Sequence, residues 1–292
     1  MYNVSFPGLG INNIPVDPTI EIFGFTIYWY GMIIASGLIL ACIYAWFSSA
    51  RFNVDRDKLF NCVLVGLITG IIGARLYYVA FRWEHYMQNP MEIFYINEGG
   101  LAIYGGIIGA LAGGCIIAKI QKMTIPAVLD IAGLGFLIGQ GIGRWGNFMN
   151  QEAFGDPTNL PWGMVSENTG GVTVHPCFLY ESLWCLIGFV LLHFLSKKYQ
   201  KYGGQVFLCY LVWYGFERMI VEGLRTDSLY LPFEVFGQAI RVSQLLSLVI
   251  VIFGIVMLII NRKKEDSFYA DYRRKKSVSR SEGTSSKGNW RA

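Results

Sequence analysis

The sequence contains few charged residues. Only 15% of its 292 residues are Asp, Glu, Lys or Arg, against about 25% in an average soluble domain. Hydrophobic residues make up 53%, and the mean hydropathy is +0.41. So few charges cannot cover a soluble particle of this size, which implies contact with lipid and argues against a disordered chain or a cytosolic enzyme. The net charge of +4 does not indicate nucleic-acid binding, because ten of the 24 Lys and Arg residues follow residue 260.

The sequence also lacks the signatures of a metal site and of a leader peptide. Its six cysteines form no C-x-x-C pair and no Cys/His spacing that is typical of a metal site. Five of them lie in apolar runs, where cysteine behaves as a small hydrophobe. We therefore expect no metal and no cofactor. The N-terminus has no basic region and no small-residue cleavage site, so we expect no cleaved signal peptide.

Long apolar stretches are the main feature that the sequence does contain. A membrane span needs roughly 20 mostly apolar residues, and in lipid the backbone groups must pair within their own segment, which favours helices. We therefore predict an all-α integral membrane protein with seven transmembrane helices. The stretches, with soft edges, are 24–47, 59–81, 101–120, 126–147, 176–195, 204–222 and 243–260.

The third stretch is rich in glycine. Gly105, Gly109 and Gly113 recur every four residues, a spacing that lets two helices approach closely. We interpret most of these glycines as packing positions.

The distribution of Lys and Arg over the connections predicts the orientation. One side carries 18 of these residues and the other side three, while three more lie inside the spans. Because cytoplasmic loops carry the excess of positive charge, the N-terminus should face outward and the C-terminus the cytoplasm. We predict a membrane domain over residues 1–260, with an extracytoplasmic loop at 148–175. Residues 261–292 should form a disordered basic cytoplasmic tail, with R-R-K-K at 273–276 resting on anionic lipid.

Each predicted helix brings a polar group to the half of the membrane nearest the outer side. Ionisable residues inside a bilayer are costly, and they are functional candidates by default. This convergence predicts a polar chamber at the depth of the outer headgroups. The residues are Tyr30, Arg75, Tyr104, Arg144, Asn147, Tyr180, Glu181, Tyr214, Arg218, Glu222, Ser243 and Gln244.

At least two guanidinium groups would line that chamber. Arginine presents paired donors that suit phosphate oxygens, so the most available ligand is a phospholipid headgroup. The alternative is that each arginine pairs with a glutamate and holds the bundle together. Arg218 and Glu222, four residues apart, can meet on one helix face in this way.

Two further patterns have weaker interpretations. Residues 141–146 match the dinucleotide fingerprint G-x-G-x-x-G, but they end an apolar segment instead of joining a strand to a helix, so we reject nicotinamide or flavin binding. In the loop at 148–175, Glu152 lies eight residues beyond Arg144 and is close enough to return over the site. For His175 we favour a structural role over catalysis.

Together, several motifs resemble the prolipoprotein diacylglyceryl transferase family. The resemblance extends to about residue 260 and keeps the order of the motifs, and the block at 143–152 is highly specific. The motifs are Y-G at 30–31, G-G-I-I-G at 105–109, G-R-W-G-N-F-M-N-Q-E at 143–152, H-P-C-F-L-Y-E at 175–181, and Y-G-F-E-R-M-I-V-E-G-L-R at 214–225.

The resemblance implies a multi-pass enzyme of the bacterial inner membrane. It would transfer the diacylglyceryl group of phosphatidylglycerol to the thiol of the lipobox cysteine in the signal peptide of a prolipoprotein. A thioether forms and glycerol 1-phosphate leaves, in the first step of lipoprotein maturation. The partners would be phosphatidylglycerol, prolipoprotein signal peptides and membrane lipids, with no nucleic acid.

The resemblance also implies roles for individual residues. Arg144 and Arg218 match the two essential arginines of the family. Other sensitive positions match Tyr30, Asn147, Glu152, Gly155, Tyr214, Glu222 and Arg225. From their position in the spans, we add Arg75 and Gln244 as substrate-binding candidates.

Tyr104 departs from the family pattern. Many members have at this position a His that is assigned the role of general base. A tyrosine has an unperturbed pKa near 10, which makes it a poor base at neutral pH unless a nearby arginine stabilises the phenolate. Either Tyr104 acts in that way, or the base lies elsewhere, or the position orients substrate. We include Tyr104 with Arg144 and Arg218 as a catalytic candidate.

Two other classes of protein could contain such a chamber. A seven-helix phospholipid transporter would need polar residues across the full depth of the bilayer, whereas here they stop at the outer half. A lipid-binding membrane protein without chemistry could hold the same arginines but would release the lipid unchanged.

Overall fold

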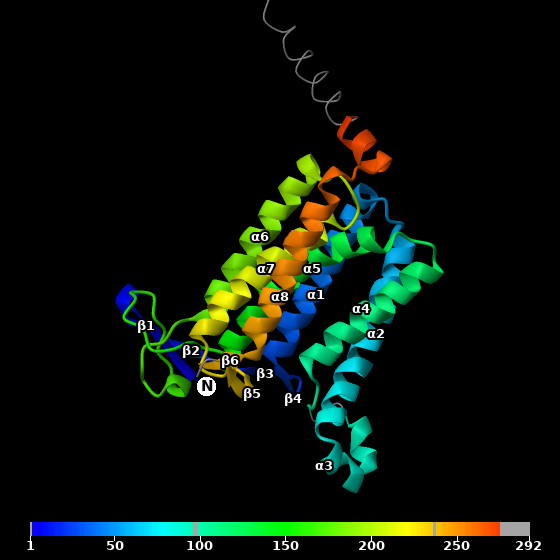
Figure 1. Cartoon of the computed structure of the whole chain (residues 1–292). Helices are drawn as coiled ribbons and strands as arrows, with labels where there is room; N and C mark the ends of the chain where they lie inside the picture. Colours follow the sequence, from blue (N-terminus) through cyan, green and yellow to red (C-terminus); the bar gives the residue numbers. More distant parts are fainter. Residues whose placement is uncertain (1, 96–98, 236–237, 275–292) are drawn as a thin grey trace, which may run out of the picture. The chain divides into compact units, whose positions relative to one another are not determined.

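The computed structural model describes residues 2–95, 99–235 and 238–274 (Figure 1). The chain divides into two compact units. The first unit comprises Met1–Tyr44 and Asp130–Ala292, and the second comprises Ala45–Leu129. Both unit boundaries fall inside long helices, so each unit contains part of these helices.

Within the described residues, seven helices have 18 residues or more. The first unit contains α5 (Ile125–Asn150) from Asp130 onward, α6 (Cys177–Tyr199), α7 (Gln205–Leu224), α8 (Val242–Ile260) and most of α1 (Trp29–Ser48). The second unit contains α2 (Arg56–Phe81), the short α3 (Trp83–Gln88), α4 (Ile103–Ile120), and 3-10 helices at Ser49–Phe52 and Pro90–Phe94. Six of the seven predicted spans therefore match a helix closely in position.

Six helical segments of the described chain are long and apolar enough to cross a membrane. They are Trp29–Phe52, Arg56–Phe81, Ile103–Ile120, Ile125–Asn150, Cys177–Tyr199 and Val242–Lys263. The 20-residue helix α7 is not among them, because Glu217, Arg218 and Glu222 fall in its last two turns. The chain is thus a mostly helical, multi-pass membrane protein. The seventh span and the orientation of the termini stay predictions.

The structure also contains three short antiparallel hairpins that the all-α prediction omits. They are β1 (Tyr2–Phe6) with β2 (Ile11–Val16), β3 (Thr19–Ile22) with β4 (Phe25–Tyr28), and β5 (Tyr230–Val235) with β6 (Gln238–Arg241). The predicted first span therefore begins too early, since β4 occupies its first turn. Aromatic and β-branched residues such as those of β4 pack well in strands, and the turn at Phe23 and Gly24 has positive φ at both positions.

The first hairpin packs on the loop that follows α5. Val4, Val16, Met164 and Val174 form a buried cluster with Phe178 of α6. Ser5 and Val165 exchange backbone hydrogen bonds of 2.9 and 2.8 Å. These contacts hold the loop against the beginning of α6.

In the second unit, α2 and α4 pack through glycine, which confirms the prediction from their spacing. A Cβ on Gly73 would lie 3.1 Å from the Cα of Gly109, and a Cβ on Gly109 would lie 3.2 Å from the Cα of Gly73. Either side chain would force the helices apart.

The described part of the tail is ordered, which differs from the disorder predicted from residue 261. Asn261–Lys263 forms a 3-10 helix, and residues 267–274 are helical. Asp266 accepts a hydrogen bond of 2.9 Å from the backbone N–H of Gly203, and Tyr269 is buried. These two side chains hold this segment on the loop before α7. The basic run at 273–276 continues into residues 275–292, which lie outside the described residues.

Candidate active site

Three arginines of the first unit converge on one buried carboxylate, that of Glu181 in the second turn of α6. Arg144 of α5 places Nη2 2.5 Å from Glu181 Oε2, and Arg218 of α7 places Nη1 3.3 Å from the same oxygen. Arg225, directly after α7, places Nη1 3.6 Å from Oε1. The side chains of Arg144 and Arg218, predicted to share one chamber, therefore meet at Glu181.

Two more carboxylates complete the set of charges. Arg218 Nη2 lies 2.5 Å from Glu222 Oε2, four residues further along α7. Arg225 donates to both carboxylate oxygens of Asp227, at 2.9 and 2.7 Å. This hydrogen bonding by the Arg225 guanidinium lowers the pKa of the Asp227 carboxyl below its usual value.

The resulting arginine cluster, which consists of Arg144, Arg218, Arg225, Glu181, Glu222 and Asp227, is balanced in charge. The two glutamate side chains are only 2% exposed, whereas those of Arg144 and Arg218 are 22% and 16% exposed. Glu181 and Glu222 are thus less accessible than Arg144 and Arg218, which an incoming anion can reach, whereas the side chain of Asp227 is 51% exposed. A guanidinium has five N–H donors, which is more than the contacts of Arg144 or Arg218 in this cluster use.

A chain of amide hydrogen bonds extends from Arg144 to the loop. Arg144 donates to Asn147 Oδ1 at 3.3 Å, and Asn147 Nδ2 donates to Glu152 Oε1 at 3.0 Å. Asn150 donates to the same glutamate oxygen at 3.3 Å. The backbone turns sharply after α5, with positive φ at Gln151. Glu152 therefore returns toward Arg144, as its spacing predicts.

Gly155 lies where the loop meets the end of α7. Its N–H donates to the carbonyl of His175 at 2.9 Å, and the next residue, Asp156, donates to the carbonyl of Leu224 at 2.7 Å. A Cβ on Gly155 would lie 2.8 Å from His175 Cβ and 2.9 Å from both Cys177 Sγ and Leu224 O. The predicted substrate-binding position is thus one where no side chain fits.

Three other predicted residues border the cluster or support it. Tyr30, in the first turn of α1, lies against Gly146, where a Cβ would be 2.7 Å from the tyrosine ring. The Tyr214 ring stacks on that of Tyr210 at 5.9 Å and interacts electrostatically with Arg218. Gln244 of α8 donates to the carbonyl of Met219 at 2.9 Å, which ties α8 to α7.

Arg75 belongs to the second unit. All five N–H donors of its guanidinium go to main-chain carbonyls, and the group lies 5.3 Å from the centre of the Tyr86 ring. The acceptors are Ile93 at 2.9 Å, Gly99 and Gly100 at 2.9 Å each, Glu92 at 2.5 Å and Tyr95 at 3.3 Å. No donor is left for a substrate, so this geometry favours a structural role over the predicted substrate-binding role.

Tyr104 also belongs to the second unit. It lies in the first turn of α4, with its ring tilted against that of Tyr77 at 6.5 Å. Its part in the reaction stays a prediction.

The sequence interpretation missed two carboxylates of this region. The sequence indicates that Glu181 is polar but does not name it as a site residue, although its carboxylate contacts three arginines. Glu217, 3% exposed on α7, was not noted. The signal for both was an acidic residue within an apolar run.

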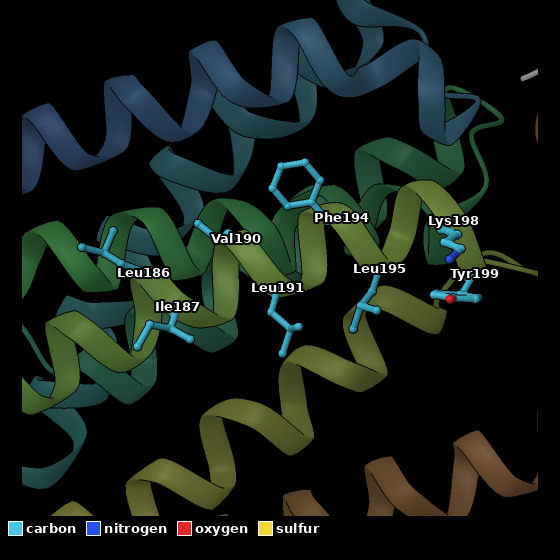
Figure 2. A pocket seen from close by; sticks show the side chains of 8 residues that line it. All are labelled: Leu186, Ile187, Val190, Leu191, Phe194, Leu195, Lys198 and Tyr199. Carbon is cyan, nitrogen blue, oxygen red and sulfur yellow. The ribbon is translucent and has the colours of Figure 1, made fainter. Parts of the chain in front are cut away.

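An apolar groove on α6 lies apart from the arginine cluster. The groove has a volume of about 620 Å³. Figure 2 shows the side chains that line it, with Lys198 at one end. The lining residues are Leu186, Ile187, Val190, Leu191, Phe194, Leu195, Lys198 and Tyr199. Such a surface suits acyl chains, but a single lysine beside a tyrosine offers no arrangement for catalysis.

Comparison with known proteins identifies the family of this chain. The sequence model of the prolipoprotein diacylglyceryl transferase family matches residues 18–260. A phosphatidylglycerol–prolipoprotein diacylglyceryl transferase of Enterococcus faecalis is 43% identical over 275 residues, covering 89% of this chain and 96% of the relative. Proteins of the same name from Finegoldia magna and Clostridioides difficile are 44% and 43% identical, covering 84% and 83% of this chain and 95% and 94% of the relatives. The chain therefore belongs to the prolipoprotein diacylglyceryl transferase family.

Proposed function

We propose that this chain transfers the diacylglyceryl group of phosphatidylglycerol to the lipobox cysteine of prolipoproteins, with the arginine cluster as its catalytic centre. The activity is the one named for its relatives, which match most of the chain. The observation that carries the assignment to this site is the meeting of Arg144 and Arg218 at Glu181.

The reaction breaks one bond and forms another at the same glyceryl carbon. The cysteine sulfur forms the C–S bond, and the electrons of the C–O bond pass to the phosphate oxygen, so that glycerol 1-phosphate leaves. Negative charge on the phosphate rises as the bond breaks. Arg144 and Arg218 bind that charge more strongly in the transition state than in the substrate, which is how such donors accelerate a reaction.

The remaining residues of the site have supporting roles in this proposal. Asn147 holds Arg144 in place, and Glu222 does the same for Arg218. Glu152 is exposed at the end of the amide chain, where its free acceptor capacity suits the hydroxyl groups of the glycerol headgroup. Tyr30 and Tyr214 border the cluster, and their phenol groups can contact the glyceryl ester region.

We also infer the remaining topology from the sequence. Charges inside a span are tolerated where they pair with one another, and the arginine of α7 is paired with Glu181 and Glu222. This pairing supports α7 as a seventh span. The excess of Lys and Arg on one side supports an N-terminus outside and a C-terminus in the cytoplasm. The location would be the bacterial inner membrane, and residues 1–260 would form the catalytic domain.

No observation favours a transporter or a lipid-binding protein without chemistry. Mass spectrometry separates the three possibilities. Purified protein is mixed with phosphatidylglycerol and a signal peptide that contains the lipobox cysteine. We expect the peptide to gain the mass of a diacylglyceryl group. A peptide of unchanged mass, with the lipid intact, would overturn the enzymatic proposal.

Variants then assign the reaction to the arginine cluster. Arg144→Ala and Arg218→Ala should each reduce the transfer rate by about 10²–10³, the effect of removing one donor to a developing oxyanion. Arg262→Ala, which changes an exposed arginine beyond α8, is the control and should retain the wild-type rate. Full activity in either cluster variant would contradict the assignment.

A further inference from the structure

Glu217 is a buried carboxyl group that has no hydrogen-bond partner among the described residues. It lies on α7, directly before Arg218, and is 3% exposed. Neither of its carboxylate oxygens accepts a hydrogen bond from any residue that the structure describes. A buried acidic group without partners is destabilising, so its presence in a membrane helix indicates a function.

Glu217 interacts electrostatically with charged and polar groups of three helices. Two of these groups, Tyr210 and Cys185, both contact Gln140 of α5. The Tyr210 hydroxyl accepts a hydrogen bond of 3.2 Å from the Gln140 amide, and the Cys185 sulfur lies 4.0 Å from the Gln140 amide oxygen. Glu217 is thus next to the arginine cluster and within the influence of its charges. The titratable groups that interact with it electrostatically are Arg144 of α5, Glu181 and Cys185 of α6, Tyr210, Tyr214 and Arg218 of α7, and Arg225.

The other carboxylates of this region are engaged. Glu181 and Glu222 each lie 2.5 Å from a guanidinium nitrogen. Asp227 accepts two hydrogen bonds from an arginine, and Glu152 accepts from two asparagines. Among the described carboxylates in or beside the cluster, Glu217 alone has both oxygens unoccupied. A proton can therefore be added to it without breaking an existing contact.

We propose that Glu217 accepts the proton of the substrate thiol during transfer. This inference rests on the proposed function, and it names a group that the reaction needs. The S–H proton moves to a Glu217 oxygen, either directly or through one water molecule. The sulfur electron pair forms the C–S bond, and the C–O bond electrons leave with the phosphate. The products are the thioether, glycerol 1-phosphate and a neutral Glu217.

The balance of charge supports this step. Phosphatidylglycerol carries one negative charge on its phosphodiester, whereas the phosphate monoester that leaves carries up to two at neutral pH. The thiol and the thioether are both neutral. If Glu217 loses its charge as the phosphate gains one, the total charge of the site is constant. The paired arginines then do not have to neutralise an additional charge in a medium of low dielectric constant.

The test compares a thiol with an acceptor that needs no base. Glu217→Gln retains the size and shape of the side chain but cannot take up the proton. Transfer to a cysteine peptide should fall by about 10²–10⁴, the usual effect of losing general base catalysis. Transfer to the matching selenocysteine peptide should fall far less, because a selenol is already ionised at neutral pH.

The same variant gives a readout of folding. Because Glu217→Gln retains the shape of a buried side chain whose carboxyl oxygens accept no hydrogen bond from the described residues, the variant should melt at the same temperature as the wild-type protein or above it. Glu21→Gln, the same change at an exposed glutamate on β3, is the matched control. We expect this control to retain the wild-type rate with both peptides.

Each outcome has one meaning. If the wild-type protein modifies neither peptide, the proposed function fails. If it modifies both peptides and Glu217→Gln retains the wild-type rate with cysteine, the role of Glu217 is overturned. An equal loss with cysteine and selenocysteine would also overturn it, since the group would then act on the fold or on the phosphate.

Discussion

At the scale of single residues, Glu181 holds the arginine cluster together. Its two oxygens lie near guanidinium groups from α5, from α7 and from the residue after α7. Without this carboxylate, three positive charges would face one another with only Glu222 and Asp227 to offset them. Glu181 therefore holds Arg144 and Arg218 at one point, where the proposed reaction places the phosphate.

Glu181→Gln should destabilise the protein by about 3–5 kcal/mol, the usual cost of removing one partner from a buried ion pair. The result should be a lower melting temperature, together with slower transfer. Glu21→Gln, which changes an exposed glutamate on β3, serves as the control and should leave both unchanged. A melting temperature equal to that of the wild-type protein would show that the three arginines do not need this carboxylate.

The sequence identifies Arg144 and Arg218 as candidate site residues because charged residues are rare within an apolar run. It also allows both functions of such an arginine, phosphate binding and pairing with glutamate. The structure shows that the pairing exists and that the guanidinium groups are still partly exposed. Which carboxylate pairs with which arginine depends on how α5, α6 and α7 pack. No single segment of the sequence contains that information.

At the scale of elements, Gly155 is the point where the loop after α5 meets the end of α7. The absence of a side chain allows the backbone of the loop to pair with Arg225 and Leu224. This contact fixes the loop that carries Glu152 beside the cluster. The local structure at this position thus depends on the close approach of two backbones.

Gly155→Ala should displace the loop, because the added Cβ would lie within 3 Å of three neighbouring atoms. We expect loss of stability of about 1–3 kcal/mol, as for other overpacked sites, and a reduced transfer rate. Gly139→Ala is the matched control. Gly139 lies in the middle of α5, and a Cβ added there would have no atom within 4 Å. Equal behaviour of the two variants would contradict this account.

Arg75 acts at the same scale in the second unit. Its guanidinium connects α2 to the carbonyl groups of residues 92, 93 and 95 and of Gly99 and Gly100. A lysine has three donors on a single nitrogen and cannot reproduce this planar set of five.

Arg75→Lys should therefore loosen the segment after α3 and make it more sensitive to limited proteolysis. Arg82→Lys, at the exposed end of α2, should show the wild-type pattern. If the two variants were cleaved at the same rate, Arg75 would not be the residue that holds this segment.

The elements themselves divide into those that the sequence predicts and those that it does not. Long helices are predicted well because apolar runs of about 20 residues leave few alternatives. The hairpins are missed because strands of four to six residues produce only a weak pattern. The carbonyl partners of Arg75 lie 17 to 25 residues further along the chain, in a segment without regular periodicity.

At the scale of the whole molecule, the open question is whether α7 crosses the membrane. Its composition alone argues against a span, since three charges lie near its C-terminal end. Its contacts argue for one, because Arg218 is paired with Glu181 and Glu222. α7 also packs against α6 and α8, both of which are long and apolar enough to span.

Cysteine labelling from the two sides of the membrane tests this topology. In a variant whose six native cysteines are replaced, Lys201→Cys precedes α7 and Ser228→Cys follows it. If α7 spans and the C-terminus is cytoplasmic, an impermeant thiol reagent added outside intact cells should label position 228 and leave position 201 unlabelled. Opening the cells should expose position 201. Labelling of both positions from outside would place the two ends of α7 on one side, and the arginines would then lie at the membrane surface.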